Sequence, residues 1–361
     1  MAQDILVNNQ NPEADFDQKV MKAAVLYGKG DLRLEDVPIP EIGGTDVLIK
    51  VKYTAICGTD PHIYEGRFPA KLPLILGHEF SGEVVKVGSQ VSFVQPGDRV
   101  TADINISCGT CYYCRHGQKL HCEKITQLGV HVNGAFAEYV RVPESNIHKL
   151  PESMSWIHGA YIEPLACAIS GQDKADIQYG DTVAIIGGGP MGIAHALLAQ
   201  LKGASKVILS ELNPARIESA KNISVEYVIN AGEEDPVEAV KRLTDGRGAD
   251  VVIEAVGSAY TYAQTFKLVR KGGKILVYGA APADVSIPVS PFEIYSRELT
   301  IVSSYAGTYD TFSKAIDLIA SKRFDPTPIL TNHFEFADVK EGIETAEHNK
   351  DILKTVVKIS D

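Results

Sequence analysis

The arrangement of hydrophobic and polar residues divides the chain into two parts. From Met21 to about Val142, short runs rich in β-branched residues are separated by glycine and proline. This pattern is typical of β-strands joined by tight turns. The clearest of these runs are residues 46–56, 81–88, 98–104 and 136–143. We therefore predict a β-rich, barrel-like unit in the first part of the chain.

After Pro151 the pattern changes to apolar runs that alternate with helical segments. Residues 156–172 have the apolar spacing of a helix, and further helices are expected from Met191, from Pro214 and through 238–244. The apolar runs between them are residues 182–188, 206–211, 226–230, 249–257, 271–279 and 299–305. Continuous apolar strands alternating with helices predict an α/β unit with a doubly wound parallel sheet.

These patterns predict two domains, which suits a chain of 361 residues. The tail reads as a helix over 311–321 followed by a strand over 355–360 that returns to the first unit. We expect 21–167 and 308–361 to form the β-rich domain and 168–307 to form the α/β domain. Residues 1–20 are polar and acidic, so we expect them to be a disordered extension.

Charge and hydrophobicity narrow the possible functions. The formal net charge is −11, and a negative surface repels phosphate groups, so neither nucleic acid nor a membrane is expected as a partner. No apolar run reaches the roughly 20 residues needed to cross a bilayer. The N-terminus also lacks the basic start and apolar core of a signal peptide. We therefore expect a cytoplasmic protein that acts on a small molecule.

A glycine-rich turn stands where a dinucleotide cofactor would bind. Gly187, Gly189 and Gly192 follow the apolar run 182–186, and Pro190 and Met191 open the next predicted helix. A strand, a Gly-x-Gly-x-x-Gly turn and a helix together form the context in which this spacing indicates dinucleotide binding. The first glycine allows the tight turn, the second lets the backbone approach the pyrophosphate, and the third lets helix and strand pack closely.

The next strand favours NAD as the cofactor. It ends at Glu211, and a carboxylate there can accept hydrogen bonds from the ribose hydroxyls and repel a 2′-phosphate. A solvated acidic residue at a strand end is the alternative interpretation. Arg216 could tolerate a phosphate or stack on adenine, so NADP stays open.

Four cysteines on one loop predict a structural zinc site. Cys108, Cys111, Cys114 and Cys122 lie close enough in sequence to surround one tetrahedral ion, and four thiolates leave no open coordination position. An iron–sulfur cluster or free thiols are the alternatives.

A second, dispersed set of residues suits a catalytic zinc ion. It contains a thiolate from Cys57, an imidazole from His78, and carboxylates from Glu79 and Glu163. Three such ligands leave a position for water or substrate, as catalytic zinc sites require. Each residue taken singly could equally be a core thiol, a buried histidine or a helix-start acid.

Together these motifs resemble the zinc-dependent medium-chain dehydrogenase/reductase family, in its polyol, butanediol and threonine dehydrogenase branch. The resemblance runs from Met21 to Asp361 and is most specific at GHEFSGEVVKVG, at the four-cysteine loop and at GGGPMG. It implies a GroES-like β-barrel catalytic domain plus a Rossmann coenzyme domain, usually in a homodimer or homotetramer. It also implies two zinc ions per subunit, one catalytic and one structural.

The resemblance further implies a role for each residue of the dispersed set. Cys57, His78 and Glu79 would hold the catalytic zinc, with Glu163 as a further or exchanging ligand. Thr59 and His62 would carry the alcohol proton through the nicotinamide ribose to solvent. Asp60, between them in sequence, is expected to be a hydrogen-bonding scaffold residue.

We therefore expect a zinc-dependent enzyme that transfers a hydride from a secondary alcohol, such as a polyol or diol, to NAD and yields a ketone. Threonine or a simple secondary alcohol is an alternative substrate. A zinc-free quinone or enone reductase, or a non-catalytic NAD-binding protein, is a weaker alternative. Sorbitol itself is in doubt, because Ile63 and approximately Ala306-Gly307 stand where sorbitol dehydrogenases carry an aromatic residue and an Arg-Tyr pair. Candidates for the pocket wall or the core are Tyr64, Phe68, Trp156 and Tyr305.

Overall fold

The computed structural model describes residues 18–361, and the rest of the predicted N-terminal extension lies outside this range. Strand β1 begins at Val20, one residue before the predicted Met21, so the end of the expected extension already belongs to the β-rich part. Within residues 18–361, no helix combines the length and apolarity needed to cross a membrane.

The second half of the chain builds a six-stranded sheet in which every strand pair is parallel. Its strands are β11 (Thr182–Ile186), β12 (Lys206–Glu211), β13 (Tyr227–Asn230), β14 (Ala249–Glu254), β15 (Val269–Val277) and β16 (Thr300–Ser303). The spatial order β13-β12-β11-β14-β15-β16 is that of a Rossmann fold. The predicted doubly wound sheet is therefore confirmed.

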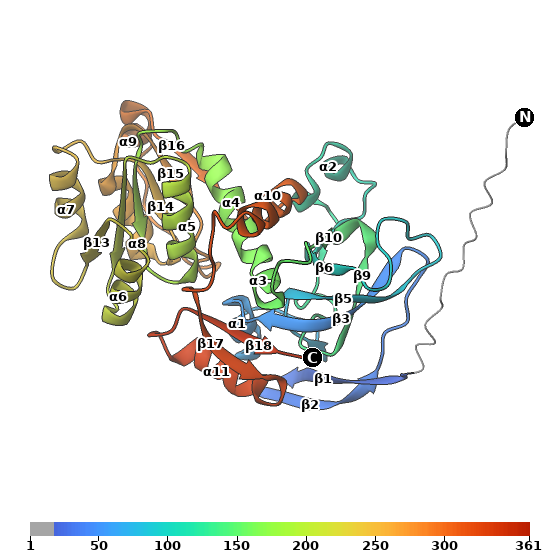
Figure 1. Ribbon diagram of the computed structural model, residues 1–361. Helices are drawn as coiled ribbons and strands as arrows, with labels where there is room; N and C mark the ends of the chain where they lie inside the picture. The colour runs from blue at the N-terminus through green and yellow to red at the C-terminus, as the bar shows by residue number, and fades with distance from the viewer. Residues whose placement is uncertain (1–17) are drawn as a thin grey trace, which may run out of the picture.

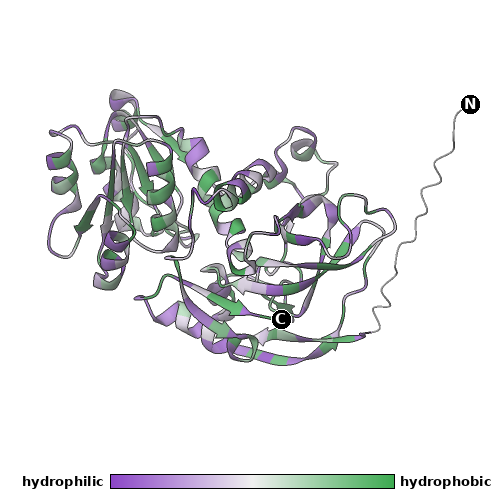
Figure 2. Cartoon of the chain, viewed as in Figure 1, coloured by the Kyte–Doolittle hydropathy of each residue, from purple (hydrophilic) through white to green (hydrophobic). Residues whose placement is uncertain are grey.

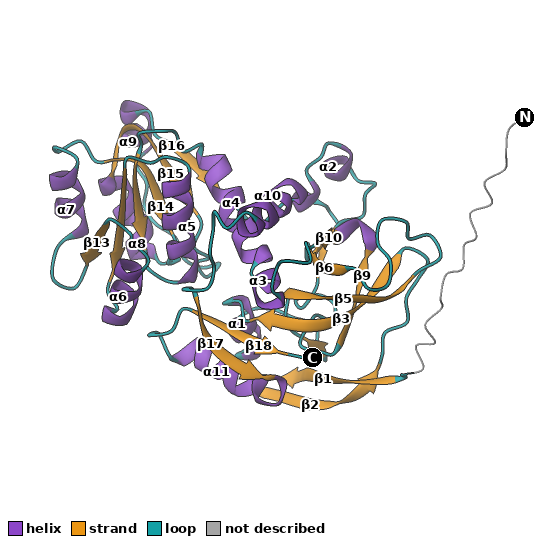
Figure 3. Ribbon diagram, in the orientation of Figure 1, coloured by secondary structure: helices purple, strands orange, loops and turns teal. Residues whose placement is uncertain are grey.

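Helices cover both faces of this sheet (Figures 1 and 3). One face packs on α4 (Ile162–Ala175), α5 (Pro190–Leu201), α6 (Pro214–Asn222) and α10 (Tyr309–Ala320). The other face packs on α7 (Pro236–Leu243), α8 (Ala259–Leu268) and α9 (Pro291–Arg297). Alternate residues of β11 enter the two cores, Val183 on one side and Ala184 on the other, which explains the unbroken apolar run. Figure 2 shows these central strands largely in the hydrophobic colour.

The helix predicted over 156–172 is interrupted at Tyr161. The structure has α3 (Trp156–Ala160) and then α4, and Tyr161 between them is fully buried. The two helices connect the β-rich half to the parallel sheet, and α4 carries Glu163 in its first turn.

The first half of the chain is β-rich, as predicted. Its strands are β1 (Val20–Gly28), β2 (Asp31–Pro38), β3 (Asp46–Ala55), β4 (Leu74–Ile75), β5 (Glu79–Val87), β6 (Arg99–Ala102), β7 (Asn105–Ile106), β8 (Thr126–Gln127), β9 (Tyr139–Pro143) and β10 (Ile147–Lys149). The main sheet runs β10-β6-β5-β3-β18-β17, with β9 also paired to β3. Two short helices interrupt the strands, α1 (Thr59–Tyr64) and α2 (Tyr112–Arg115).

The C-terminal segment returns to this sheet. It forms β17 (Leu330–Glu335), α11 (Val339–His348) and β18 (Lys354–Lys358), and β18 pairs antiparallel with β3. The predicted returning strand is confirmed, whereas β17 and α11 were not predicted. The last strand lies beside the strand that leads into Cys57, so residues near the two ends of the chain meet at one site.

Candidate functional site

The pairing of β3 with β5 brings Cys57, His78 and Glu79 together. Ala55 lies opposite Glu79 in the register, so the loop after β3 and the residue before β5 meet at one end of the sheet. One ligand atom from each of the three residues lies within 4.8 Å of the other two. His78 and Glu79 are buried, and Cys57 is partly exposed, which leaves one side of the group open.

Asp60 holds the backbone and ring geometry around this group. Its fully buried carboxylate accepts the N–H of Cys57 at 2.8 Å and that of Gly77 at 3.4 Å. The same carboxylate lies 3.5 Å from Nδ1 of His78. These contacts support the scaffold role predicted for Asp60.

Glu79 has a partner that sequence reasoning missed. Nζ of Lys354, the first residue of β18, lies 2.6 Å from the Glu79 carboxylate, and both side chains are buried. A buried charge requires such a partner, since leaving it alone costs several kcal/mol. The available signal was a lysine two residues before the apolar pair Val356-Val357, but nothing in the sequence indicated which acid it would meet.

Glu163 lies near the three-residue group but is not part of it. Its buried carboxylate accepts a hydrogen bond from the Cys167 thiol at 3.2 Å, one helical turn further along α4. Burial, together with the negative charge of Glu79, raises the pKa of Glu163 to about 7. The role of Glu163 as a further or exchanging ligand stays a prediction.

The donor set fits a divalent transition metal ion. A thiolate, an imidazole and a carboxylate are common zinc ligands, and together they suit a catalytic site. Asp60, 3.5 Å from Nδ1 of His78, would hold the imidazole ring in place beside such an ion.

The two predicted relay residues both lie on α1, directly after Cys57. Oγ1 of Thr59 lies 3.6 Å from Sγ of Cys57. His62 is one turn further along and its side chain reaches the surface. Partial burial lowers the pKa of His62, and the nearby charge of Arg67 lowers it further. The imidazole is therefore largely neutral near pH 7 and able to accept a proton.

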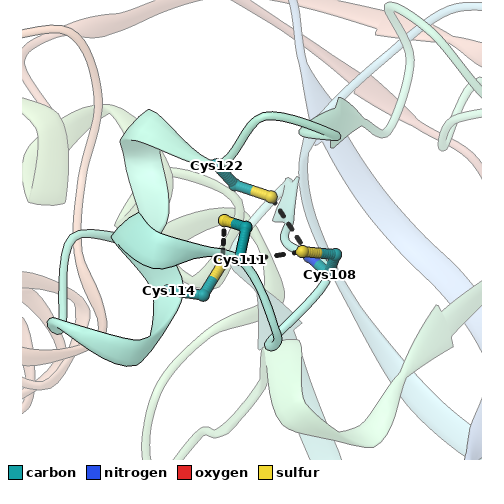
Figure 4. A group of neighbouring side chains, drawn as sticks. All are labelled: Cys108, Cys111, Cys114 and Cys122. Carbon is teal, nitrogen blue, oxygen red and sulfur yellow. Dashed lines mark hydrogen bonds between the residues drawn. The ribbon is translucent and has the colours of Figure 1, made fainter.

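The four cysteines of the loop converge as predicted (Figure 4). Sγ of Cys114 lies 3.5 Å from Sγ of Cys111 and 4.0 Å from that of Cys108. Cys122 is the buried member, and its sulfur accepts the N–H groups of Cys108 and Lys124. Backbone and hydroxyl donors from Thr110 lower the pKa of Cys108 to about 6, so this sulfur favours the thiolate form that a metal ion requires.

The glycine-rich turn joins β11 to α5 in the predicted way. Gly187 has a positive φ of 102°, and a Cβ on Gly192 would lie 1.8 Å from the Gly187 carbonyl oxygen. Gly189 is the N-cap of α5 and offers no side chain, Pro190 is the first helical residue, and Met191 packs against the core. The free N–H groups at this helix start suit a pyrophosphate.

Glu211 and Arg216 both lie beside this turn. The Glu211 carboxylate accepts the N–H of Gly188 at 2.7 Å and those of Leu212 and Asn213 at 2.6 and 2.9 Å. A guanidinium nitrogen of Arg216 lies 3.5 Å from where a Cβ on Gly189 would be, and its buried Nε has no hydrogen-bond partner among residues 18–361. An acceptor and a cation therefore border the space where the adenosine part of a dinucleotide would lie.

Two of the four candidate pocket residues are structural. Tyr64 is buried and its hydroxyl donates to Glu344 at 2.7 Å. Trp156 carries the Arg99 guanidinium 3.4 Å above its ring centre. Phe68 and Tyr305 are 41% and 63% exposed and stay candidates.

The positions at which the sequence departs from sorbitol dehydrogenases are also buried. Ile63 is buried in the apolar core of the β-rich half, Ala306 is buried, and Gly307 donates its N–H to Cys167.

Known proteins resemble this chain over most of its length. The family described as "Alcohol dehydrogenase GroES-like domain" matches residues 43–152, and "Zinc-binding dehydrogenase" matches 190–321. Sorbitol dehydrogenase of Bacillus subtilis is 34% identical over 345 residues, which cover 93% of this chain and 97% of that protein. L-threonine 3-dehydrogenase of Rhizobium etli is 34% identical over 331 residues, 90% of this chain and 95% of that one.

Solved structures show the same likeness along nearly the whole chain. A zinc-binding dehydrogenase from Sinorhizobium meliloti, bound to NADP, superimposes with a TM-score of 0.90 at 36% identity, covering 95% of this chain and all of that one. Fold, site and relatives agree. The chain belongs to the zinc-binding alcohol dehydrogenase family, in the medium-chain branch that contains sorbitol and threonine dehydrogenases.

Proposed function

We propose that this protein oxidises a secondary alcohol of the polyol or diol class to a ketone, with NAD as the hydride acceptor. The observation that carries the proposal is the convergence of Cys57, His78 and Glu79 next to Thr59. A zinc-free quinone or enone reductase needs no Lewis acid, so this buried donor set speaks against that alternative. A non-catalytic NAD-binding protein would need neither this set nor a relay.

The chain's own residues divide the work of the reaction. A zinc ion held by Cys57, His78 and Glu79 would act as a Lewis acid on the alcohol hydroxyl. Thr59, beside Cys57, would accept the hydroxyl proton while passing its own through the nicotinamide ribose to His62. His62 reaches solvent and would release the proton there. NAD supplies the hydride chemistry, while the protein aligns the reacting groups.

The end of β12 supports NAD over NADP. The Glu211 carboxylate is fixed by three backbone N–H groups, and a 2′-phosphate near it would meet a negative charge. Arg216 beside it could offset that repulsion, and a similar structure holds NADP. The ratio of the two cofactors' kcat/KM values therefore tests this part of the proposal directly.

The four-cysteine loop is proposed to hold a second, structural zinc ion. Its sulfurs already surround a common centre, and Lys119 on the same loop forms an ion pair with the buried Asp103. The loop is thereby tied to the β-rich sheet, which fits a stabilising role.

The domain boundaries proposed from the sequence, at 167 and 307, fall within α4 and just before α10.

A second copy of the chain is the proposed protein partner. Strand β16 ends the order of the parallel sheet and is largely exposed. Phe292 and Tyr295 on α9, which follows β15, are 74% and 80% exposed. An open sheet edge beside exposed aromatic residues suits association through a two-fold axis. Replacing both aromatics by lysine should give a monomer in analytical ultracentrifugation, and an unchanged mass would reject this surface.

The decisive experiment follows reduction of the nicotinamide by absorbance, with alditols, 2,3-butanediol, threonine and 2-propanol as substrates. Cys57→Ser should abolish turnover while leaving NAD binding nearly intact, because Cys57 lies outside the dinucleotide turn. Turnover that survives in Cys57→Ser, or after verified removal of the metal, would favour the zinc-free reductase. The preferred alcohol in the panel would identify the substrate class.

A further inference from the structure

The helix that carries both relay residues cannot hold its own position. Helix α1 has six residues, and its N-cap, Gly58, provides no side-chain cap. Helices of this length are unstable in isolation, so tertiary contacts must fix it. The geometry of Thr59 and His62 therefore depends on what α1 packs against.

Helix α11 supplies those contacts from the far end of the sequence. The two helices pack together, and Figure 1 labels both in the β-rich half of the molecule. The hydroxyl of Tyr64, the last residue of α1, donates to Oε1 of Glu344 at 2.7 Å. Three residues beyond, Arg67 forms a 2.7 Å ion pair with Glu347, whose side chain is 18% exposed.

Backbone hydrogen bonds connect the anchored Arg67 to His62. The N–H groups of Arg67 and Phe68 both donate to the His62 carbonyl oxygen, at 2.8 and 3.1 Å. Anchoring Arg67 through Glu347 therefore anchors the last turn of α1. A shift of α11 would move the relay histidine with it.

The same ion pair balances charge near the His62 imidazole. The charged groups that act on it are Arg67, Glu347 and Lys350. Arg67 and Lys350 disfavour the imidazolium, whereas Glu347 favours it. Because Arg67 and Glu347 are in contact, their opposite charges largely offset one another at the ring.

We propose that α11 is the positioning element of the proton relay, with Glu344 holding the helix that carries Thr59 and His62, and the Glu347–Arg67 pair setting the charge balance at His62. The inference rests on the proposed function for the meaning of the relay. Glu344 and Glu347 act through α1 and are positioning residues rather than catalytic ones. The acidic face of α11 is thereby assigned a role in the reaction.

The first test measures the titration of His62 directly. Histidine-selective ¹³C labelling of the enzyme without coenzyme, with His62→Gln to assign the signal, gives its pKa by NMR. Glu347→Gln leaves the Arg67 charge unopposed and should lower this pKa, whereas Arg67→Met leaves the Glu347 charge unopposed and should raise it. Equal pKa values in both variants and the parent, or shifts in the same direction, would overturn the charge-balance part.

The second test addresses the hold on α1. Tyr64→Phe and Glu344→Leu each remove the hydrogen bond and should lower kcat about 10-fold, part of what proton transfer contributes, with KM for NAD unchanged. Glu344→Gln keeps an acceptor oxygen for Tyr64 and should restore kcat. A loss in Glu344→Gln equal to that in Glu344→Leu, or no loss in either, would reject the positioning role.

Different results would reject the relay role of His62 and the positioning role of α11. If His62→Gln leaves the pH profile of kcat unchanged, the relay assigned to His62 is wrong, whatever the NMR shifts show. If His62→Gln alters that profile but the α11 variants change neither the His62 pKa nor kcat, the relay stands and the inference about α11 is wrong. Thermal melting of each variant separates these outcomes from unfolding.

Discussion

Gly192 gives the most direct test of whether the glycine-rich turn between β11 and α5 binds the dinucleotide. The Gly192→Ala substitution adds one methyl group whose carbon would lie 1.8 Å from the Gly187 carbonyl oxygen. Because non-bonded contacts under 3.0 Å are not tolerated, the turn and the start of α5 must separate by at least about 1.2 Å. The oxygen belongs to the backbone, so no side-chain rotation can relieve the contact.

The expected cost follows from this displacement. A misplacement of about 1 Å costs roughly 100-fold where groups must be aligned, which corresponds to about 2.7 kcal/mol. The loss of one hydrogen bond to a charged phosphate, about 1.5–3 kcal/mol, gives the same size. We therefore expect the Kd for NAD to rise about 100-fold in Gly192→Ala.

The assay is a titration of the enzyme with NADH, followed by nicotinamide fluorescence. Gly28→Ala is the matched control, because a Cβ at Gly28 meets no atom within 4 Å and the residue lies outside the glycine-rich turn. Its Kd should equal that of the parent. A rise of less than about 3-fold in Gly192→Ala, with parental thermal melting, would refute the reasoning, since the turn would then not be the pyrophosphate site.

Three further variants test the remaining parts of the site. Cys111→Ser should remove one equivalent of bound zinc and lower the melting temperature; parental zinc content and melting would contradict the structural role. Glu211→Ala should raise kcat/KM with NADP relative to NAD, and an unchanged ratio would show that this carboxylate does not read the ribose. Lys354→Met should lower the free energy of unfolding of the metal-free protein by about 3–5 kcal/mol, because without zinc it leaves the Glu79 charge buried without its partner. Urea denaturation measures this loss, and a value under about 1 kcal/mol would mean that the pair is not sealed from water.

The parts of the site that could be predicted from the sequence are those formed by local chain geometry. The cysteines from Cys108 to Cys122 lie on one loop, so their spacing alone indicated that they bind a common ion. The glycine turn was readable for the same reason, since strand, turn and helix are consecutive. Apolar runs likewise predicted the parallel strands, because both faces of that sheet are buried.

The parts that could not be predicted depend on strand pairing and on side-chain environment. Cys57 meets His78 because β3 and β5 pair with Ala55 opposite Glu79, a register that no local signal specifies, so this grouping was expected only from the residue types and the family resemblance. Tyr64 and Trp156 were ambiguous, since an aromatic residue can line a pocket or fill a core, and here both are structural.

The returning C-terminal segment explains why the catalytic half of the chain is discontinuous. After the parallel sheet, the chain places α11 against α1 and then β18 against β3, where the Thr355 carbonyl accepts the N–H of Ile56, next to Cys57. One residue earlier, Lys354 neutralises Glu79. The same segment therefore supports the backbone beside one proposed metal ligand, the charge of another, and the helix of the proposed relay. A chain that ended after the parallel sheet would keep Cys57, His78 and Glu79 in its sequence but would lack the contacts that hold them in place.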